Sequence, residues 1–390
     1  MYSISSSIVL STRREAQAVS RAGGYHCVVF ASCIHMEVAA VPIIVDTDIG
    51  DNLDDTWALL FLLALKKYAN IVLVSTAGNG NHRKRAAIVA QLCKGAGRDN
   101  IPIVCGTYDG GEGDKILAQE KWLDFSVQET LSAYPSFLGR TTASQQIVNK
   151  VMTSKDNVTI LAIGPMHNIA DALKLEPRIA KRANFVSMAG SIYKGYGNSN
   201  TPAAEFNVAS AVEEAKMVFK TKWLTSYNVP LDTCGKVVID GEAFNRLVDA
   251  SILCSSSMAN ILMDNFNVWY DNTDLLLKRL PVLRQYIKPA RGGRSSTIFN
   301  TLAALVAIRP TLPSHINNWI TFQNLFVEVD DNGFTKIVDF TSLDGQYHNF
   351  ATFWKYKNAK DEFIDFLVNA LTKTFDRDKT SKQYNVMAKL

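Results

Sequence analysis

The six cysteines of this chain form no metal-binding or redox pattern. They are scattered, without CxxC or Cys/His spacing, and several stand in apolar runs where cysteine acts as a small hydrophobic residue. We therefore expect reduced, structural cysteines. No stretch approaches the roughly 20 uninterrupted apolar residues that cross a bilayer, so we expect no membrane-spanning segment and no membrane partner.

The chain also lacks a strong excess of positive or of negative charge. The 41 basic and 37 acidic residues leave a formal net charge of +4, with no dense cationic stripe that would neutralise many phosphates. A nucleic-acid partner is therefore not expected. With 47% hydrophobic and 20% charged residues, the composition is typical of a globular protein with a sizeable core.

Residues 1–35 differ from the rest of the chain. They contain arginines and few acids before a short apolar stretch, Cys27 to Ile34, which resembles a leader but lacks a clean cleavage site. Met36 stands shortly before the first strong strand. We predict a leader or disordered extension over 1–35 and a single domain over 36–390. We expect a cytoplasmic protein, or a secreted one if residues 1–35 act as a leader.

Apolar runs alternate with helical patterns from residue 41 onward. VPIIVDTD, residues 41–48, predicts a strand, and the segment from Asp54 predicts an apolar helix. IVLVSTAGNG, residues 71–80, repeats this arrangement, and three further apolar runs follow before residue 190. Because each strand is apolar throughout, we expect an α/β fold with a largely parallel open sheet flanked by helices.

Four of these predicted strands end in short polar or glycine-containing loops, at Asp48, Asn79, Gly164 and Gly190. Ligands of parallel sheets bind outside the carboxyl ends of the strands. The four loops should therefore converge on one crevice.

The pattern changes in the last third of the chain. Between about residues 236 and 296 it becomes helical, and we expect a helical insertion near the mouth of the crevice. An apolar helix in TIFNTLAALVAIRP, residues 297–310, follows and is ended by Pro310. Short strands around a DNG turn and an amphipathic helix near 359–375 should close the chain.

The segment DTDIGDNLDD, residues 46–55, places five carboxylates in ten residues between a buried strand and a helix. Hard divalent cations take several oxygen ligands, and such a cluster supplies them. Helix capping by Asp51, Asp54 and Asp55 is the alternative. Capping explains two acids but hardly five, so the cluster favours a metal site.

This segment resembles the N-terminal signature of the inosine-uridine-preferring nucleoside hydrolase family, a DxDxG turn followed by DD. The motifs STAGN (75–79), IGPMHN (163–168), SMAG (187–190) and AEFN (204–207) follow in the family's order. AEFN preceded by MAG is the most specific signal. The resemblance covers residues 41–310 clearly and the tail weakly.

The resemblance implies a calcium-dependent enzyme that hydrolyses ribonucleosides to free base and ribose, serves ribonucleoside catabolism and purine salvage, and forms a homodimer or homotetramer. It implies that Asp48 is the general base toward a calcium-bound water. The implied calcium ligands are Asp48, Asp55, Ile163 through its carbonyl, and Asn300. The implied substrate-binding residues are Asp54, Asn79, Met188, Asn198, Glu205 and Asn207.

Two features depart from the family pattern. Phe299 and Asn300 stand where a His-Asp pair is expected, so the site loses one negative charge and an acid that could protonate the departing base. In addition, the loop between Asp48 and Asp54 is longer than the commonest form.

These departures leave a second hypothesis, a weakened or inactive relative that binds a nucleoside or pentose. A third is a phosphatase of the haloacid dehalogenase type, which expects Thr or Val where Gly50 stands and does not explain AEFN. His82 and His167 are more often capping or surface residues at such positions, and Trp269, Tyr270 and Tyr286 more often packing residues. Base preference is not readable from the sequence.

Overall fold

The computed structural model describes residues 39–110, 115–255, 257–274, 293–314, 316 and 318–373. The predicted leader or extension over 1–35 lies outside these residues. The described residues from Ala40 onward cluster as one compact unit. The single domain over 36–390 stays a prediction.

The described residues form a nine-stranded sheet in the order β3-β2-β1-β4-β5-β6-β9-β7-β8. The strands from β3 to β9 in this order pair in parallel, and only the two pairs that β7 makes, with β9 and with β8, are antiparallel. This confirms the expected largely parallel open sheet. The strands are β1 (Val41–Thr47), β2 (Ala69–Thr76), β3 (Ile103–Cys105), β4 (Val158–Ala162), β5 (Ala183–Met188), β6 (Thr225–Val229), β7 (Ile320–Val329), β8 (Thr335–Ile337) and β9 (Gln346–Trp354).

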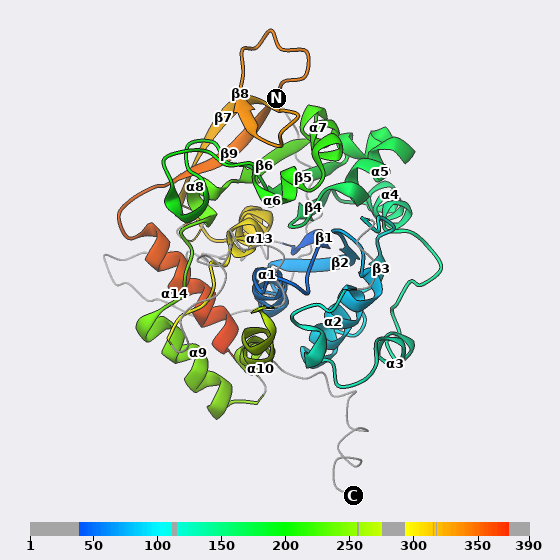
Figure 1. The fold of residues 1–390 in the computed structure, drawn as a ribbon, viewed down its shortest axis with the longest axis vertical. Coiled ribbons are helices and arrows are strands. Elements are labelled where there is room, and N and C mark those ends of the chain that lie inside the picture. Colours follow the sequence, from blue (N-terminus) through cyan, green and yellow to red (C-terminus); the bar gives the residue numbers. More distant parts are fainter. Residues whose placement is uncertain are drawn as a thin grey trace, which may run out of the picture. The chain divides into compact units, whose positions relative to one another are not determined.

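Helices cover both faces of the sheet (Figure 1). The α-helices are α1 (Asp54–Ala64), α2 (His82–Gly95), α3 (Val127–Ser132), α4 (Ala143–Thr153), α5 (His167–Leu175), α6 (Phe206–Ala209), α7 (Val212–Lys220), α8 (Leu231–Cys234), α9 (Gly241–Leu253), α10 (Met258–Asn272), α13 (Asn300–Ile308) and α14 (Ala359–Thr372). Short 3-10 turns include η1 (Glu120–Trp122), η2 (Pro177–Lys181), η3 (Tyr196–Asn198) and η5 (Arg309–Thr311). None of the described helices is long and apolar enough to span a membrane.

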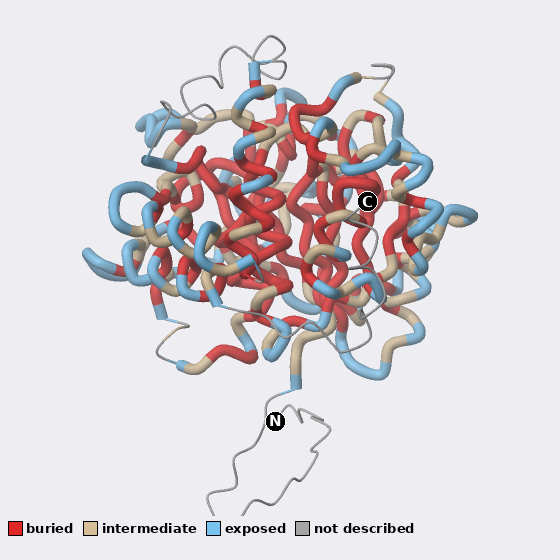
Figure 2. The backbone as a smooth tube through the Cα atoms, turned by 90° about the horizontal axis from the view of Figure 1, so that it is seen from below, coloured by how far each residue is buried: buried red, intermediate tan, exposed pale blue. Residues whose placement is uncertain are grey.

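Alternate residues of β1 pack into two different cores. Ile43 and Val45 belong to a large core with α1, α2, α10, α13 and α14, whereas Ile44 faces a second core with α4, α5 and α7. Strand side chains point to opposite faces of a sheet, so a strand that is buried on both faces reads as continuously apolar. Figure 2 shows this buried interior surrounded by exposed segments.

The C-terminal part adds an antiparallel extension to the sheet. The predicted strands around the DNG turn are present as β7 and β8, and α14 matches the predicted closing helix. The sequence analysis missed β9, which inserts between β6 and β7 and is parallel to β6. Its irregular burial pattern explains the miss, because its sequence, QYHNFATFW, shows neither clean alternation nor a continuous apolar run.

The expected helical insertion is present, within the described residues, as α9 and α10. Trp269 on α10 is fully buried, and its Nε1 donates a hydrogen bond to the carbonyl of Asp51 at 2.8 Å. The helix therefore lies directly against the aspartate-rich loop that follows β1. Tyr286, also considered from the sequence, lies outside the described residues.

Candidate functional site

The loops after β1, β2 and β4 meet around Asp48. A Cβ on Gly164 would lie 2.8 Å from the backbone nitrogen of Asp48, and a Cβ on Gly78 would lie 2.9 Å from the Asp48 Cβ. Only glycine permits approaches this close. Three of the four loops that were expected to converge at the carboxyl ends of the strands therefore meet at Asp48.

Asp46, two residues earlier, holds the neighbouring elements together. Its carboxylate is fully buried and accepts hydrogen bonds from Ser75 Oγ at 2.5 Å and from Asn168 Nδ2 at 2.8 Å. Asn168 Nδ2 also donates to the carbonyl of Thr76 at 2.9 Å. Asp46 thus ties β1 to β2 and to the start of α5, which places the loop containing Ile163 and Gly164 beside Asp48.

Arg85 on α2 binds the aspartate-rich loop that follows β1 through hydrogen bonds and an ion pair. Its Nη1 donates to the carbonyls of Asp48 and of Ile49, the latter at 2.8 Å, and its Nη2 pairs with Asp51 Oδ2 at 3.2 Å. Arg85 is only 4% exposed. Sequence reasoning missed this residue because HRKR reads as a solvated basic stretch, and only the helical packing shows that one of its arginines is buried.

Asp54 and Asp55 begin α1 and are both buried. Thr47 Oγ1 donates to Asp55 at 2.5 Å. The backbone N–H of Asn300, at the start of α13, donates to the Asp54 carboxylate. The ends of α1 and α13 thus meet at the carboxylates, and one otherwise unsatisfied N–H of α13 is bound.

Burial of several carboxylates in one place raises their pKa values. Burial is the largest cause in each case, bringing the pKa of Asp46 to about 7, of Asp48 to about 6 and of Asp54 to about 8. The pKa of Asp55 is raised well above its ordinary value, by burial and then by repulsion from Asp48 and Asp54. A bound cation would relieve this repulsion, so the cluster fits a cation better than it fits helix capping.

The oxygen atoms near this cluster suit calcium. Asn300 Nδ2 and Asn207 Nδ2 both lie 3.4 Å from the carbonyl oxygen of Ile163, and Asn300 Oδ1 is buried with no hydrogen-bond partner in the described part of the chain. The two ends of an amide are interchangeable in such assignments, so a turned Asn300 would present Oδ1 beside the Ile163 carbonyl. Two neighbouring oxygens of this kind repel each other unless a cation binds both.

The residues described contain no group of three or more His, Cys, Asp or Glu side chains arranged to hold a metal ion. The donor set predicted from the sequence contains two carboxylates, from Asp48 and Asp55. The other two donors are the Ile163 carbonyl and the Asn300 amide. An all-oxygen set of this composition matches calcium and gives no support to zinc.

The predicted sugar-binding residues gather at the end of β5 and the start of α6. Glu205 is buried and accepts from the backbone N–H groups of Asn207 at 2.9 Å and of Gly190 at 3.2 Å. Asn207 Nδ2 donates to the carbonyl of Met188 at 3.0 Å. Burial raises the pKa of Glu205 to about 7, and Asp48 contributes to this rise, so the two carboxylates sense each other.

The last two predicted sugar-binding residues are placed differently. Asn79 Oδ1 is buried and, in the described part of the chain, has no hydrogen-bond partner, while Gly110 leaves room for the Asn79 side chain. Asn198 is exposed at the end of η3, with a φ of 63°. The structure thus brings Asn79 to the loop of Gly78 beside Asp48, whereas Asn198 projects from the surface.

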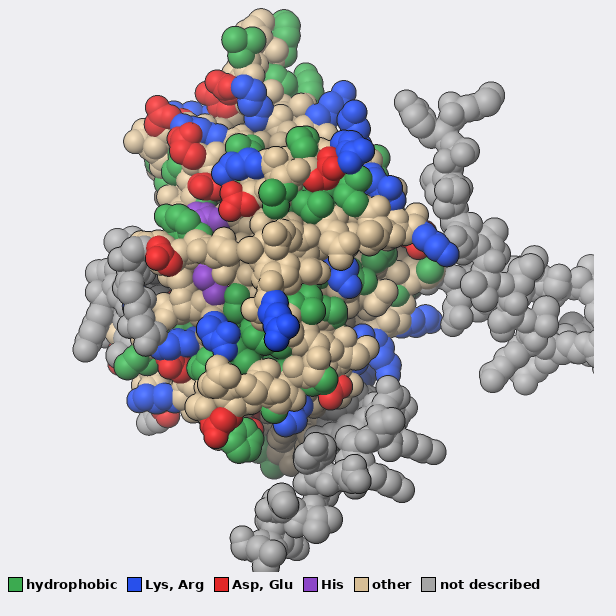
Figure 3. Space-filling model, turned by 90° about the vertical axis from the view of Figure 1, so that its right-hand side faces the viewer, with side chains coloured by type: hydrophobic (Ala, Val, Ile, Leu, Met, Phe, Trp, Pro, Cys, Tyr) green, Lys and Arg blue, Asp and Glu red, His purple; other side chains and the backbone are tan. Residues whose placement is uncertain are grey.

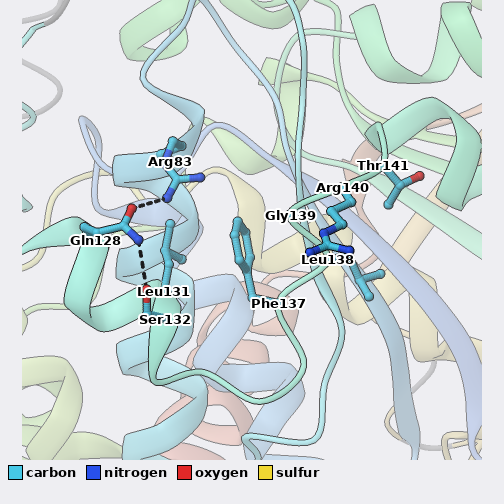
Figure 4. Close-up of a pocket in the computed structure, with 9 residues that line it drawn as sticks. All are labelled: Arg83, Gln128, Leu131, Ser132, Phe137, Leu138, Gly139, Arg140 and Thr141. Carbon is cyan, nitrogen blue, oxygen red and sulfur yellow. Dashed lines mark hydrogen bonds between the residues drawn. The ribbon is translucent and has the colours of Figure 1, made fainter.

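A cavity of about 760 Å³ lies elsewhere, between α2, α3 and the loop after Phe137. Figure 4 shows Arg83 bonded to Gln128 on one side of Phe137 and Arg140 on the other. Its lining shares no residue with the carboxylate cluster. On the face drawn in Figure 3, basic and acidic side chains are interspersed.

Comparisons with known proteins bear on the family to which the chain belongs. A sequence model described as inosine-uridine preferring nucleoside hydrolase matches residues 43–363. The pyrimidine-specific ribonucleoside hydrolase RihA of Citrobacter koseri is 30% identical over 225 residues, which cover 57% of this chain and 70% of that protein. RihA of an Enterobacter species is 33% identical over 184 residues, 47% of this chain and 57% of the relative.

Solved structures show the same fold. A plant nucleoside hydrolase, PpNRh1, superposes with a TM-score of 0.62 at 18% identity, over 85% of this chain and 99% of the other. A purine-preferring ribonucleoside hydrolase from Gardnerella vaginalis gives 0.61 at 16% identity, with the same coverage. The family match extends over most of the chain and includes every motif singled out above. The chain therefore belongs to the inosine-uridine preferring nucleoside hydrolase family, whose members are nucleoside N-glycosidases.

Proposed function

We propose that this protein hydrolyses the N-glycosidic bond of ribonucleosides to free base and ribose, with calcium as its metal and Asp48 as general base. The observation that carries the proposal is the position of Asp48. It is half-buried where the loops after β1, β2 and β4 meet, with the carboxylates of Asp54 and Asp55 close enough to affect or be affected by its charge.

Calcium would be held by Asp48, Asp55, the Ile163 carbonyl and the Asn300 amide oxygen. When bound, it supplies positive charge that offsets the carboxylate repulsion and makes a nearby water easier to deprotonate. Asp48 then takes the proton. Burial raises the pKa of this carboxylate to about 6 in the absence of calcium, and a bound cation would lower it, so Asp48 is ionised at neutral pH and able to accept a proton.

The remaining residues act on the sugar. Glycosidic cleavage passes through an oxocarbenium-like state, which nearby negative charge stabilises. Asp54 and Glu205 supply that charge, and Asn79, Asn207 and Met188 line the ribose alongside them. The unsatisfied Oδ1 of Asn79 provides an acceptor for a ribose hydroxyl. Asn198 would join the ribose only if its exposed loop moves toward it.

The test is release of free ribose from a panel of purine and pyrimidine nucleosides, with calcium and with chelator. Relatives named pyrimidine-specific and a structural neighbour named purine-preferring make both classes necessary. Asp48→Ala should abolish turnover. Asp171→Ala, at an α5 side chain that is 46% exposed and paired with Lys174, is the matched control and should not. Undiminished turnover in Asp48→Ala, or in chelator, would refute the mechanism.

A second function is favoured by one specific observation, the replacement of a charged pair by Phe299 and Asn300. In this case the protein binds a nucleoside or pentose without efficient turnover. Calorimetric titration with a nucleoside that is not cleaved at millimolar calcium would establish this alternative.

We also propose that the protein is a homodimer or homotetramer, as the resemblance to its family implies, and, as a separate proposal, that it is cytoplasmic. Light scattering of the purified chain tests the assembly, and cell fractionation tests the location. A monomer at micromolar concentration would contradict the proposed dimer or tetramer.

A further inference from the structure

Cleavage of the N-glycosidic bond leaves an electron pair on the departing base. A hydrogen-bond donor next to the base stabilises that developing charge, and without one the base is a poor leaving group. A bound cation favours the ionised forms of Asp54 and Glu205, and an ionised carboxylate cannot donate. Phe299, which precedes the proposed ligand Asn300, is apolar and cannot donate either.

The Tyr196 side chain, on η3, lies against this position. Its ring packs edge-on against Phe299, with ring centroids 6.1 Å apart and an interplanar angle of 83°. Its phenol oxygen accepts a hydrogen bond from the backbone N–H of Phe206 at 2.9 Å. The side chain is thus held at both ends, by the residue before Asn300 and by the residue after Glu205.

The phenol also lies beside the segment of two proposed ribose-binding residues, because Phe206, from whose N–H it accepts, stands between Glu205 and Asn207. Burial raises its pKa well above the ordinary value, and the charges of Glu205 and Asp54 raise it further. Both carboxylates are therefore within electrostatic reach of the hydroxyl, which stays protonated and keeps a proton to donate. The residue is half-buried, so a substrate can still contact it.

We propose that Tyr196 contacts the nucleobase and donates a hydrogen bond to it while the C1′–N bond breaks. This inference rests on the proposed function. The bond's electron pair moves onto the base, water oxygen bonds to C1′, and the water proton passes to Asp48. That proton then reaches the base through solvent, so the products are ribose and the neutral base, and the phenol is unchanged at the end.

The experiment compares nucleosides with 4-nitrophenyl β-D-ribofuranoside in the calcium-loaded protein. Nitrophenolate departs at neutral pH without a donor, whereas uracil and hypoxanthine benefit from one. For Tyr196→Phe, which keeps the ring packed on Phe299, we expect kcat/KM for uridine and inosine to fall about 10- to 100-fold, mostly in kcat. The nitrophenyl riboside should be cleaved at close to the wild-type rate.

Tyr193→Phe is the matched control. Tyr193 is 37% exposed and stacks on Phe353, so the loss of its hydroxyl should leave the cleavage of both substrates unaffected. Equal loss on both substrates in Tyr196→Phe would overturn the proposal, because the tyrosine would then only position its loop. Unchanged nucleoside cleavage would overturn it too. A wild-type protein that cleaves neither substrate would instead refute the proposed function itself.

Discussion

At the scale of single residues, the site depends on a few atoms that no local pattern identifies. Asn300 is the clearest case. Its position in an apolar helix suggests an ordinary buried residue, yet its Oδ1 is unsatisfied and its amide lies beside the Ile163 carbonyl. The family resemblance predicts that Asn300 is a calcium ligand, and a physical argument for this prediction needs the position of its amide beside the Ile163 carbonyl, which only the structure gives.

Asn300→Asp should strengthen calcium binding. The substitution adds a charged oxygen to the proposed donor set at almost unchanged volume, and calcium affinity rises with ligand charge, here by roughly tenfold. Calorimetric calcium titration measures the change. Asn149→Asp, on the exposed surface of α4, adds the same charge far from the site and should leave the affinity unaltered. Equal affinities for Asn300→Asp and wild type would exclude Asn300 as a ligand.

Gly164→Ala should remove most of the activity. The added Cβ would lie 2.8 Å from the Asp48 nitrogen and 3.0 Å from Asp48 Oδ1, so Asp48 must move. A displacement of about 1 Å of a catalytic group costs on the order of 100-fold in rate.

Single-turnover kinetics with saturating nucleoside measures this loss. Gly95→Ala is the control, because its new Cβ meets only the flexible end of Ile261, at 3.2 Å. A fully active Gly164→Ala protein would show that Asp48 does not need its present position.

At the scale of elements, α2 connects the loop after β2 to the aspartate-rich loop. Arg85 is the link, since it bonds Gly80 at its own end and Ile49 and Asp51 on the other loop. The helix therefore does more than cover the sheet. It fixes the shape of a loop that is longer than the family's commonest form.

Arg85→Met should destabilise the protein by about 3–5 kcal/mol, because removing one partner leaves buried carbonyls and a carboxylate uncompensated. Urea denaturation, followed by circular dichroism, measures the free energy of unfolding. Arg83→Met, on the same helix turn but exposed, should change it far less. Equal effects of the two substitutions would mean that the Arg85 contacts contribute little.

The strands of the first half of the sheet were predictable because they are apolar throughout and are followed by clear helices. The carboxyl-end loops were predictable for the same reason. β9 was not, since half of its residues are polar and its place between β6 and β7 depends on pairing between segments more than 100 residues apart. The contact of Trp269 with the Asp51 carbonyl is another long-range consequence of packing.

At the scale of the whole molecule, the buried acids make stability depend on pH and calcium together. The folded-state pKa values of Asp48, Asp54 and Glu205, about 6, 8 and 7, exceed the ordinary values of 3.8 and 4.5. The folded protein therefore binds more protons than the unfolded chain across this range. In chelator, the contribution of these groups to stability falls as pH rises from about 4 to about 8.

Calcium should reverse this trend, because it binds the deprotonated cluster. We expect the increase in Tm on adding calcium to be larger at about pH 8 than at about pH 5, as measured by differential scanning calorimetry. Asp48→Asn should reduce the difference. The same calcium-induced increase at both pH values would contradict a cation site built from these acids.

Local patterns in the chain were sufficient to predict the α/β class and the succession of strands and helices. They were also sufficient to predict the sheet edge at which ligands are expected to bind, and to recognise the motifs of the family. Hydrophobic periodicity and turn chemistry act over a few residues, so they can be read without coordinates. The Arg85 contacts, the tie between Asp46 and Asn168, and the placement of Tyr196 against Phe299 could not be. Each joins segments distant in the chain, and its geometry follows from how whole helices and strands pack around a common core.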